Sequence, residues 1–88
     1  MGSFEIEFKR SVWKDLRGLP KAVVVRVLER VERLAEEPFP REAVKLAGTE
    51  RLYRVRVGDY RIVYEVDADA RLVLVYYVRH RREAYRRL

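Results

Sequence analysis

Two alternating segments limit this chain to folds that contain an antiparallel β-hairpin. In Leu52–Val57 and Tyr60–Val66, apolar residues alternate with charged ones over much of each segment. This period of two is typical of strands that bury one face. Gly58 and Asp59 lie between the segments and are typical of a two-residue hairpin turn. The sequence therefore predicts two neighbouring strands with one apolar face.

The same alternation gathers positive charge on the other face of the hairpin. Because alternate side chains of a strand share a face, Arg54 and Arg56 should stand beside Arg61, away from the apolar residues. Like charges on neighbouring strands destabilise a sheet. One interpretation is therefore that this cluster binds an anion. The other is a solvated outer face with cross-strand pairs, such as an arginine with Glu65.

The rest of the chain predicts two helices and two further strands. Residues 4–8 alternate like a strand, and Ser11 offers an N-cap for a short helix that Gly18 and Pro20 end. Helical periodicity predicts a second helix over about residues 21–37, stopped by the prolines of "EPFP". Residues 41–50 form a connection, and 71–78 a last strand before a basic tail.

This order predicts an α+β domain of the type β-α-α-β-β-β. We expect a mostly antiparallel sheet with two helices packed on one face and a short basic C-terminal helix or tail. With 88 residues, the chain should form a single domain over residues 1–88.

Composition narrows the possible partners and chemistry. The net charge of +6 favours an anionic partner, such as nucleic acid, an acidic protein or a membrane surface, although a solvated surface is an alternative. There is no cysteine and a single histidine, His80, which argues against disulfides, thiol chemistry and a zinc site. No apolar run approaches the roughly 20 residues of a membrane helix, and the N-terminus lacks a signal-peptide core. We therefore expect a cytoplasmic protein.

The C-terminal segment extends the basic cluster. If the last strand lies beside the hairpin, its end brings Arg81 and Tyr85 to the face that carries the arginines. Guanidinium groups can neutralise a phosphate and its transition state, and aromatic rings can stack on unpaired bases. The segment also contains Arg79, His80 and Arg82. Spacing alone leaves open whether such a site binds RNA or cleaves it.

These segments resemble the RelE/ParE superfamily of toxins from type II toxin–antitoxin modules, most of all its RelE branch. The resemblance covers nearly the whole chain: "DLRGLP" and "LAEEPFP" are similar to the family's helical hairpin, "KLAGTERLYRVRVGDYRIVY" to its central strands and "VRHRREAY" to its C-terminal catalytic segment. It implies an RelE-like toxin that cleaves mRNA in the ribosomal A site and stops translation. It also implies a cognate antitoxin, which we expect to be acidic in its toxin-binding segment, and a toxin–antitoxin complex that binds operator DNA.

The resemblance also implies roles for individual residues. Arg54, Arg56 and Arg61 correspond to family positions that hold the phosphate and stabilise charge at phosphorus. Arg81 would contact the scissile phosphate and leaving group, and Tyr85 would activate the 2′-hydroxyl. Secondary candidates for RNA binding are His80, Arg79 and Arg82.

The implied mechanism is attack by the RNA's own 2′-hydroxyl, without metal or cofactor. Some relatives carry lysine on the first hairpin strand, and arginine at Arg54 and Arg56 is a poorer proton donor, so their proton-transfer role is in doubt. Two alternatives stay open: a ParE-like inhibitor of DNA gyrase and a non-catalytic basic module that binds nucleic acid.

Overall fold

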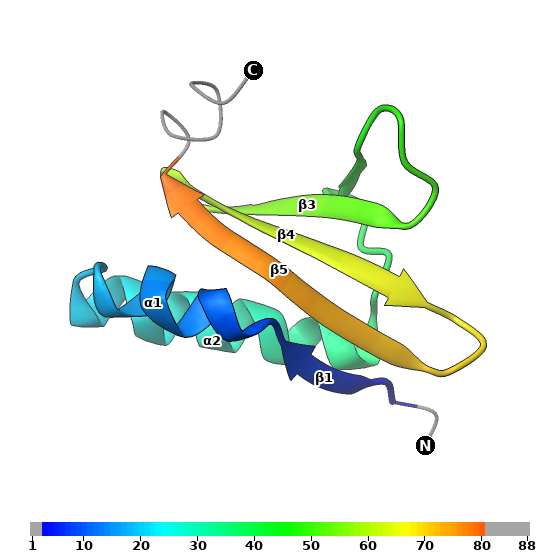
Figure 1. The fold of residues 1–88 in the computed structure, drawn as a ribbon, viewed down its shortest axis with the longest axis horizontal. Coiled ribbons are helices and arrows are strands. Elements are labelled where there is room, and N and C mark those ends of the chain that lie inside the picture. Colours follow the sequence, from blue (N-terminus) through cyan, green and yellow to red (C-terminus); the bar gives the residue numbers. More distant parts are fainter. Residues whose placement is uncertain (1–2, 81–88) are drawn as a thin grey trace.

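A computed structural model describes residues 3–80, which form two helices and a five-stranded sheet (Figure 1). The predicted C-terminal helix or tail lies outside these residues. Among residues 3–80, no helix combines the length and the apolar character needed to cross a membrane. The elements in chain order are β1 (Glu5–Phe8), α1 (Arg10–Arg17), α2 (Lys21–Glu36), β2 (Val44–Lys45), β3 (Leu52–Val57), β4 (Tyr60–Asp67) and β5 (Leu72–His80).

The strands lie in the order β1-β5-β4-β3-β2, and both helices lie on one side of this sheet (Figure 1). β1 pairs with β5 in parallel, whereas the other neighbours are antiparallel. The predicted α+β class with a mostly antiparallel sheet is thus confirmed. Gly58, at φ +58°, and Asp59 join β3 to β4 with Val57 opposite Tyr60, as the hairpin motif predicts.

The first helix begins one residue earlier than the predicted N-cap. The Lys9 N–H still donates to the Val75 carbonyl at 2.9 Å, so the chain stays beside β5 up to this residue. Lys9 then occupies the N-cap position, and its carbonyl accepts from the Val12 N–H at 2.9 Å. The parallel pairing with β5 therefore sets the start of α1, and Ser11 lies inside its first turn.

The core lies between the helices and the apolar face of the sheet. Valines dominate it: Val12 of α1 and Val27 of α2 meet Val55 and Val75 of the sheet, all of them buried. Among the fully buried side chains, Tyr64 has the largest volume, and its hydroxyl donates to the Pro38 carbonyl at 2.9 Å. Burial raises the pKa of Tyr64 far above its ordinary value. The hydroxyl thus stays protonated and links the sheet to the end of α2.

The connection after α2 contains the short strand β2, which the sequence did not predict. Val44 pairs with Arg54 and Lys45 with Tyr53, and the Leu46 N–H donates to the Leu52 carbonyl at 2.9 Å. Within residues 3–80, β2 therefore covers the first half of β3. The second half of β3 is an edge of the sheet.

Candidate nucleic-acid interface

Three arginines lie side by side across the centre of the sheet. Arg56 of β3 is directly opposite Arg61 of β4, and Arg61 is directly opposite Arg79 of β5. Directly opposed residues project to the same face of a sheet. This face points away from the helices, because the neighbouring Val55 and Val78 point the other way and are buried in the core.

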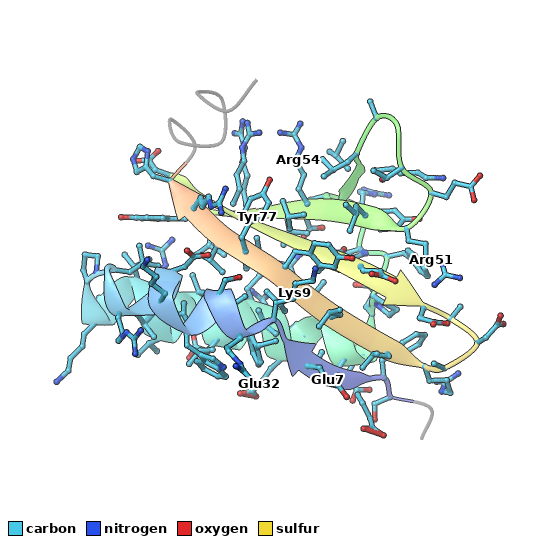
Figure 2. The ribbon with its side chains drawn as sticks, in the orientation of Figure 1. Glu7, Lys9, Glu32, Arg51, Arg54 and Tyr77 are labelled. Carbon is cyan, nitrogen blue, oxygen red and sulfur yellow. The ribbon has the colours of Figure 1, made fainter. Side chains whose placement is uncertain are left out.

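A second row lies two residues further from the hairpin turn. Arg54 is opposite Val63, and Val63 is opposite Tyr77. Figure 2 shows Arg54 and Tyr77 on the side of the sheet away from the helices. We call Arg54, Arg56, Arg61, Tyr77 and Arg79 the outer-face cluster. The structure thus brings together the three hairpin arginines that the sequence placed on one face.

The members of the outer-face cluster differ in exposure. Arg56 is exposed, and Arg54 and Arg79 are half-buried. Arg61 is only 6% exposed, so the expectation that all three hairpin arginines stand on an open face is wrong for this residue. Its position explains the burial: β4 is the central strand of the sheet, with neighbours on both sides. A long side chain buried in this way has few rotamers, so the Arg61 guanidinium is held nearly fixed.

Tyr77 joins the outer-face cluster because of a β-bulge. Strict alternation along β5 would send Tyr77 to the helix side with Val73 and Val75. The register shifts between Val63 and Tyr64, which leaves Tyr76 as an extra residue and reverses the faces that follow. Sequence reasoning missed this residue, although two adjacent tyrosines before a buried valine break the alternation and are a signal of a bulge.

The reversed register gives the cluster an aromatic contact. The Arg79 guanidinium carbon lies 4.3 Å from the centre of the Tyr77 ring, in the geometry of a cation–π interaction. This contact orients the guanidinium plane, and within residues 3–80 no carboxylate forms an ion pair with it. Arg79 is therefore placed beside Arg61 with its positive charge retained.

The far end of the same face is charge-balanced. Glu65 accepts a hydrogen bond from the Tyr76 hydroxyl at 2.6 Å, and Arg51 lies 3.4 Å from Glu65 and 3.5 Å from Asp67. The bond to Glu65 raises the pKa of Tyr76. Arg51, which sequence reasoning left without a role, pairs here with acids. The acidic partners described here thus lie at the far end of the face, whereas the arginine row lies near the hairpin turn.

His80 lies on the other face. It is opposite Tyr60, and their rings meet edge to face with centroids 5.3 Å apart. Both line a pocket of about 320 Å³ with Asp15, whose carboxylate accepts from the Val78 N–H at 3.2 Å. Because Arg79 points outward, alternation turns the next residue toward the helices. The structure therefore places His80 on the other face from the outer-face cluster, although Arg79 also lines this pocket.

The remaining predicted site residues, Arg81, Arg82 and Tyr85, lie outside the described residues. Within residues 3–80, no group of three or more His, Asp or Glu side chains is arranged to hold a metal ion. What the described part of the site offers is fixed positive charge beside an aromatic ring. Such a surface can bind phosphate groups and stabilise negative charge that develops on them.

Comparison with known proteins assigns the chain to a family. Residues 6–85 match the family described as the ParE toxin of the type II toxin–antitoxin system parDE. The chain belongs to this toxin family. It is 34% identical over 86 residues to a toxin named RelE1 from Methanocaldococcus jannaschii, covering 94% of this chain and 96% of the relative. It is 31% identical over 91 residues to toxin RelG from Mycobacterium tuberculosis, covering 96% and 98%.

A solved structure agrees with the sequence relatives. The chain superposes on the archaeal RelE–RelB complex from Pyrococcus horikoshii with a TM-score of 0.80 and 37% identity, over 90% of this chain and 96% of that chain. The relatives are RelE-type toxins, which confirms the resemblance drawn from the sequence. The chain is thus an RelE-like toxin in sequence and in fold.

Proposed function

We propose that this toxin is a ribosome-dependent endoribonuclease that cleaves mRNA in the A site and so stops translation. The observation that carries the proposal is the row Arg56–Arg61–Arg79, three guanidinium groups on adjacent strands of one face. Opposed like charges lower the stability of a sheet. An anionic ligand compensates that cost, and an RNA phosphate matches the fork of donors that each guanidinium presents.

In the proposed reaction the 2′-oxygen of the RNA forms a bond to the adjacent phosphorus, and the bond from phosphorus to the 5′-oxygen breaks. The products are a 2′,3′-cyclic phosphate and a 5′-hydroxyl, with the 2′ proton lost to a base and one proton gained by the 5′-oxygen. Arg54, Arg56 and Arg61 would hold the phosphate. Tyr85 would take the 2′ proton, and Arg81 would stabilise the leaving group. No metal or cofactor takes part.

The residues make positioning and electrostatics the main source of rate. Free tyrosine has a pKa near 10, far from the optimum for a general base at neutral pH. The outer-face cluster would favour the phenolate form of a tyrosine brought beside it. The ribosome would supply orientation of the message, which can account for several kcal/mol of the barrier.

We also propose a cognate antitoxin partner, encoded with this toxin and acidic in the segment that binds it. A RelE relative was solved in complex with RelB, which supports such a partner. The net charge of +6 favours an acidic binding segment. The complex would bind operator DNA, and residues 1–88 would act as a single domain in the cytoplasm, where ribosomes are.

A translation reaction with mapped cleavage sites tests the proposal. Wild-type protein should cut messages on the ribosome, whereas Arg81→Ala and Tyr85→Phe should lose cleavage and keep antitoxin binding. Arg10→Ala, which removes an exposed charge on α1, is the matched control and should cut like wild type. Translation that stops while messages stay intact would contradict the nuclease, and unchanged cleavage in both site variants would contradict the site.

The second candidate is a ParE-like inhibitor of DNA gyrase, because the matching family is described by the parDE system. Both activities occur on one fold, so the fold does not separate them. A supercoiling assay does: inhibition of gyrase with intact messages would favour this candidate. RNA binding without growth arrest or cleavage would instead indicate a non-catalytic basic module.

A further inference from the structure

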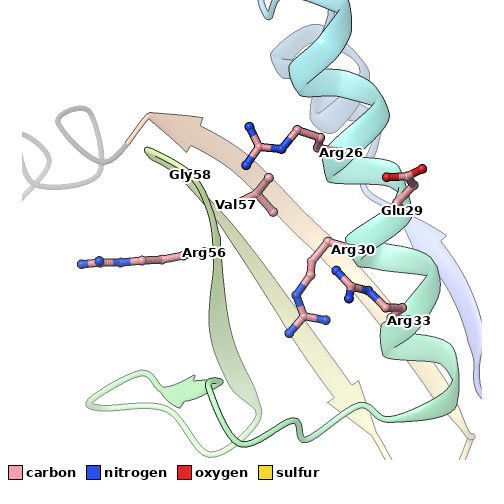
Figure 3. A pocket seen from close by; sticks show the side chains of 7 residues that line it. All are labelled: Arg26, Glu29, Arg30, Arg33, Arg56, Val57 and Gly58. Carbon is pink, nitrogen blue, oxygen red and sulfur yellow. The ribbon is translucent and has the colours of Figure 1, made fainter.

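A second basic surface lies on the helix side of the hairpin. A groove of about 250 Å³ runs between α2 and the turn end of β3 (Figure 3). Besides Glu29, its charged lining consists of four arginines: Arg26, Arg30 and Arg33 from α2, and Arg56 from β3. Figure 3 shows the α2 arginines on one side of the groove, and on the opposite strand the Arg56 side chain points away from α2. The groove is therefore reached from a different direction than the outer-face cluster.

The α2 arginines share a face of the helix because they are four and three residues apart. Arg30 is buried, and its guanidinium pairs with Glu42. Within residues 3–80, Arg26 and Arg33 are exposed and form no ion pair or hydrogen bond through their side chains, and the same holds for Arg56. Arg30 thus stabilises the wall of the groove, and two further guanidiniums, those of Arg26 and Arg33, are available to a ligand.

The hairpin turn brings Arg26 close to β3. A Cβ placed on Gly58 would lie 3.5 Å from Nη2 of Arg26, so the guanidinium rests against the backbone of the turn. Gly58 has a φ of +58°, a conformation that glycine adopts without strain. The turn therefore closes one end of the groove and holds a guanidinium there.

The edge of β3 adds one backbone donor. The Leu52 carbonyl accepts from Leu46 N–H, so Leu52 faces β2, and alternation directs the backbone groups of Arg54 and Arg56 to the same edge. β2 ends opposite Arg54. Within the described chain, the N–H of Arg56 thus lies on an uncovered edge. A single residue's backbone groups are too few to anchor an added peptide strand, whereas guanidiniums and one N–H suit a compact oxyanion.

We propose that this groove binds a phosphate group of an RNA backbone, as a second anion site on the far side of β3 from the outer-face cluster. The choice of an RNA phosphate rests on the proposed function, and the choice of an oxyanion rests on the groove itself. Arginine binds phosphate through two parallel hydrogen bonds, and it binds a carboxylate in the same way. The site would hold RNA beside the cleavage face without taking part in the reaction.

The test compares two double variants of equal charge. Arg26→Gln/Arg33→Gln removes two arginines from the groove, whereas Arg10→Gln/Arg17→Gln removes two exposed arginines from α1. Affinity for a short 2′-O-methyl RNA is measured at several salt concentrations. Each lost phosphate contact should reduce the slope of log K against log salt by about 0.7 on a single strand, and since the groove holds one phosphate, the groove variant should lose about 0.7. The α1 variant should change little, and equal losses in both would overturn the proposal.

Amide chemical shifts of Glu29 and Arg30, which line the groove from α2 and are not part of the outer-face cluster, identify the ligand. The RNA should shift both signals in wild type and neither in the groove variant, and inorganic phosphate should shift them only at much higher concentration. Phosphate that binds as tightly as the RNA would overturn the assignment to RNA, and a glutamate-rich peptide that binds more tightly would overturn the choice of phosphate. Because the 2′-O-methyl probe cannot be cleaved by its own 2′-oxygen, a toxin that cuts no message but still shows this binding would contradict the nuclease alone.

Discussion

Replacing Arg56 with glutamine should stabilise the fold while it weakens RNA binding. Arg56 lies directly opposite Arg61, so the change removes one of two facing positive charges. Side chains directly opposite each other on neighbouring strands change the stability of a sheet by about 0.2 to 1 kcal/mol. Like charges in such a pair lower the stability. Since Arg56 is exposed, solvent screens part of the repulsion, and we expect a gain in unfolding free energy of about 0.5 kcal/mol.

Urea unfolding at low salt measures this gain. With a slope of about 1 kcal/mol/M for a chain of this size, the midpoint should rise by about 0.5 M. At about 1 M salt the Debye length falls to roughly 3 Å, so the gain should disappear. Binding of RNA should weaken at the same time, because a phosphate contact is lost.

Arg56→Lys is the matched control, because lysine keeps the charge and loses the planar fork. It should leave the urea midpoint unchanged and reduce RNA affinity less than glutamine does. If lysine stabilises the fold as much as glutamine, or if the gain persists at high salt, repulsion across β3 and β4 is not the cause. Repulsion within the arginine row would then give no reason to expect an anionic ligand on it.

Two further predictions concern the buried and hydrogen-bonded tyrosines. Tyr64→Phe should lower the unfolding free energy by about 1 to 3 kcal/mol, because the Pro38 carbonyl loses its donor, and a loss of less than a few tenths of a kcal/mol would contradict this role. Burial raises the pKa of Tyr64, and the bond to Glu65 raises the pKa of Tyr76, so the folded state holds both protons more tightly than the unfolded state. The stability that these two tyrosines contribute is complete below the ordinary tyrosine pKa near 10 and should fall as the pH rises above it. In unfolding experiments at increasing pH, the double variant Tyr64→Phe/Tyr76→Phe should show a smaller decline than wild type.

The parts of the fold that sequence predicted are those with local signals. The hairpin around Gly58 combines alternation with a two-residue turn, and both are visible within 16 residues. Strand β2 has two residues, too few to show a period, and its place depends on pairing with β3. The start of α1 likewise depends on a hydrogen bond from Lys9 to distant β5. Such non-local contacts leave no periodic pattern in the sequence.

The candidate site likewise has one part that the sequence predicted and one part that it did not. The shared face of Arg54, Arg56 and Arg61 follows from alternation, which the structure preserves. The burial of Arg61 follows from strand order, and the outward position of Tyr77 follows from a bulge. The groove on α2 was not predicted, because the hairpin turn that meets its arginines is far away in the sequence.

Position within the arginine row sets what each guanidinium can contribute to a bound phosphate. Arg61 is buried in the central strand, so its charge is already in place and little rotamer entropy remains to be lost. Charge fixed before the reaction is the kind that stabilises a transition state most effectively. Arg56 is exposed at the edge, so under the proposed function it would be ordered by the ligand and would contribute mainly to binding. The same edge position lets Arg56 line the groove on α2, and this strand is therefore where the two anion sites meet.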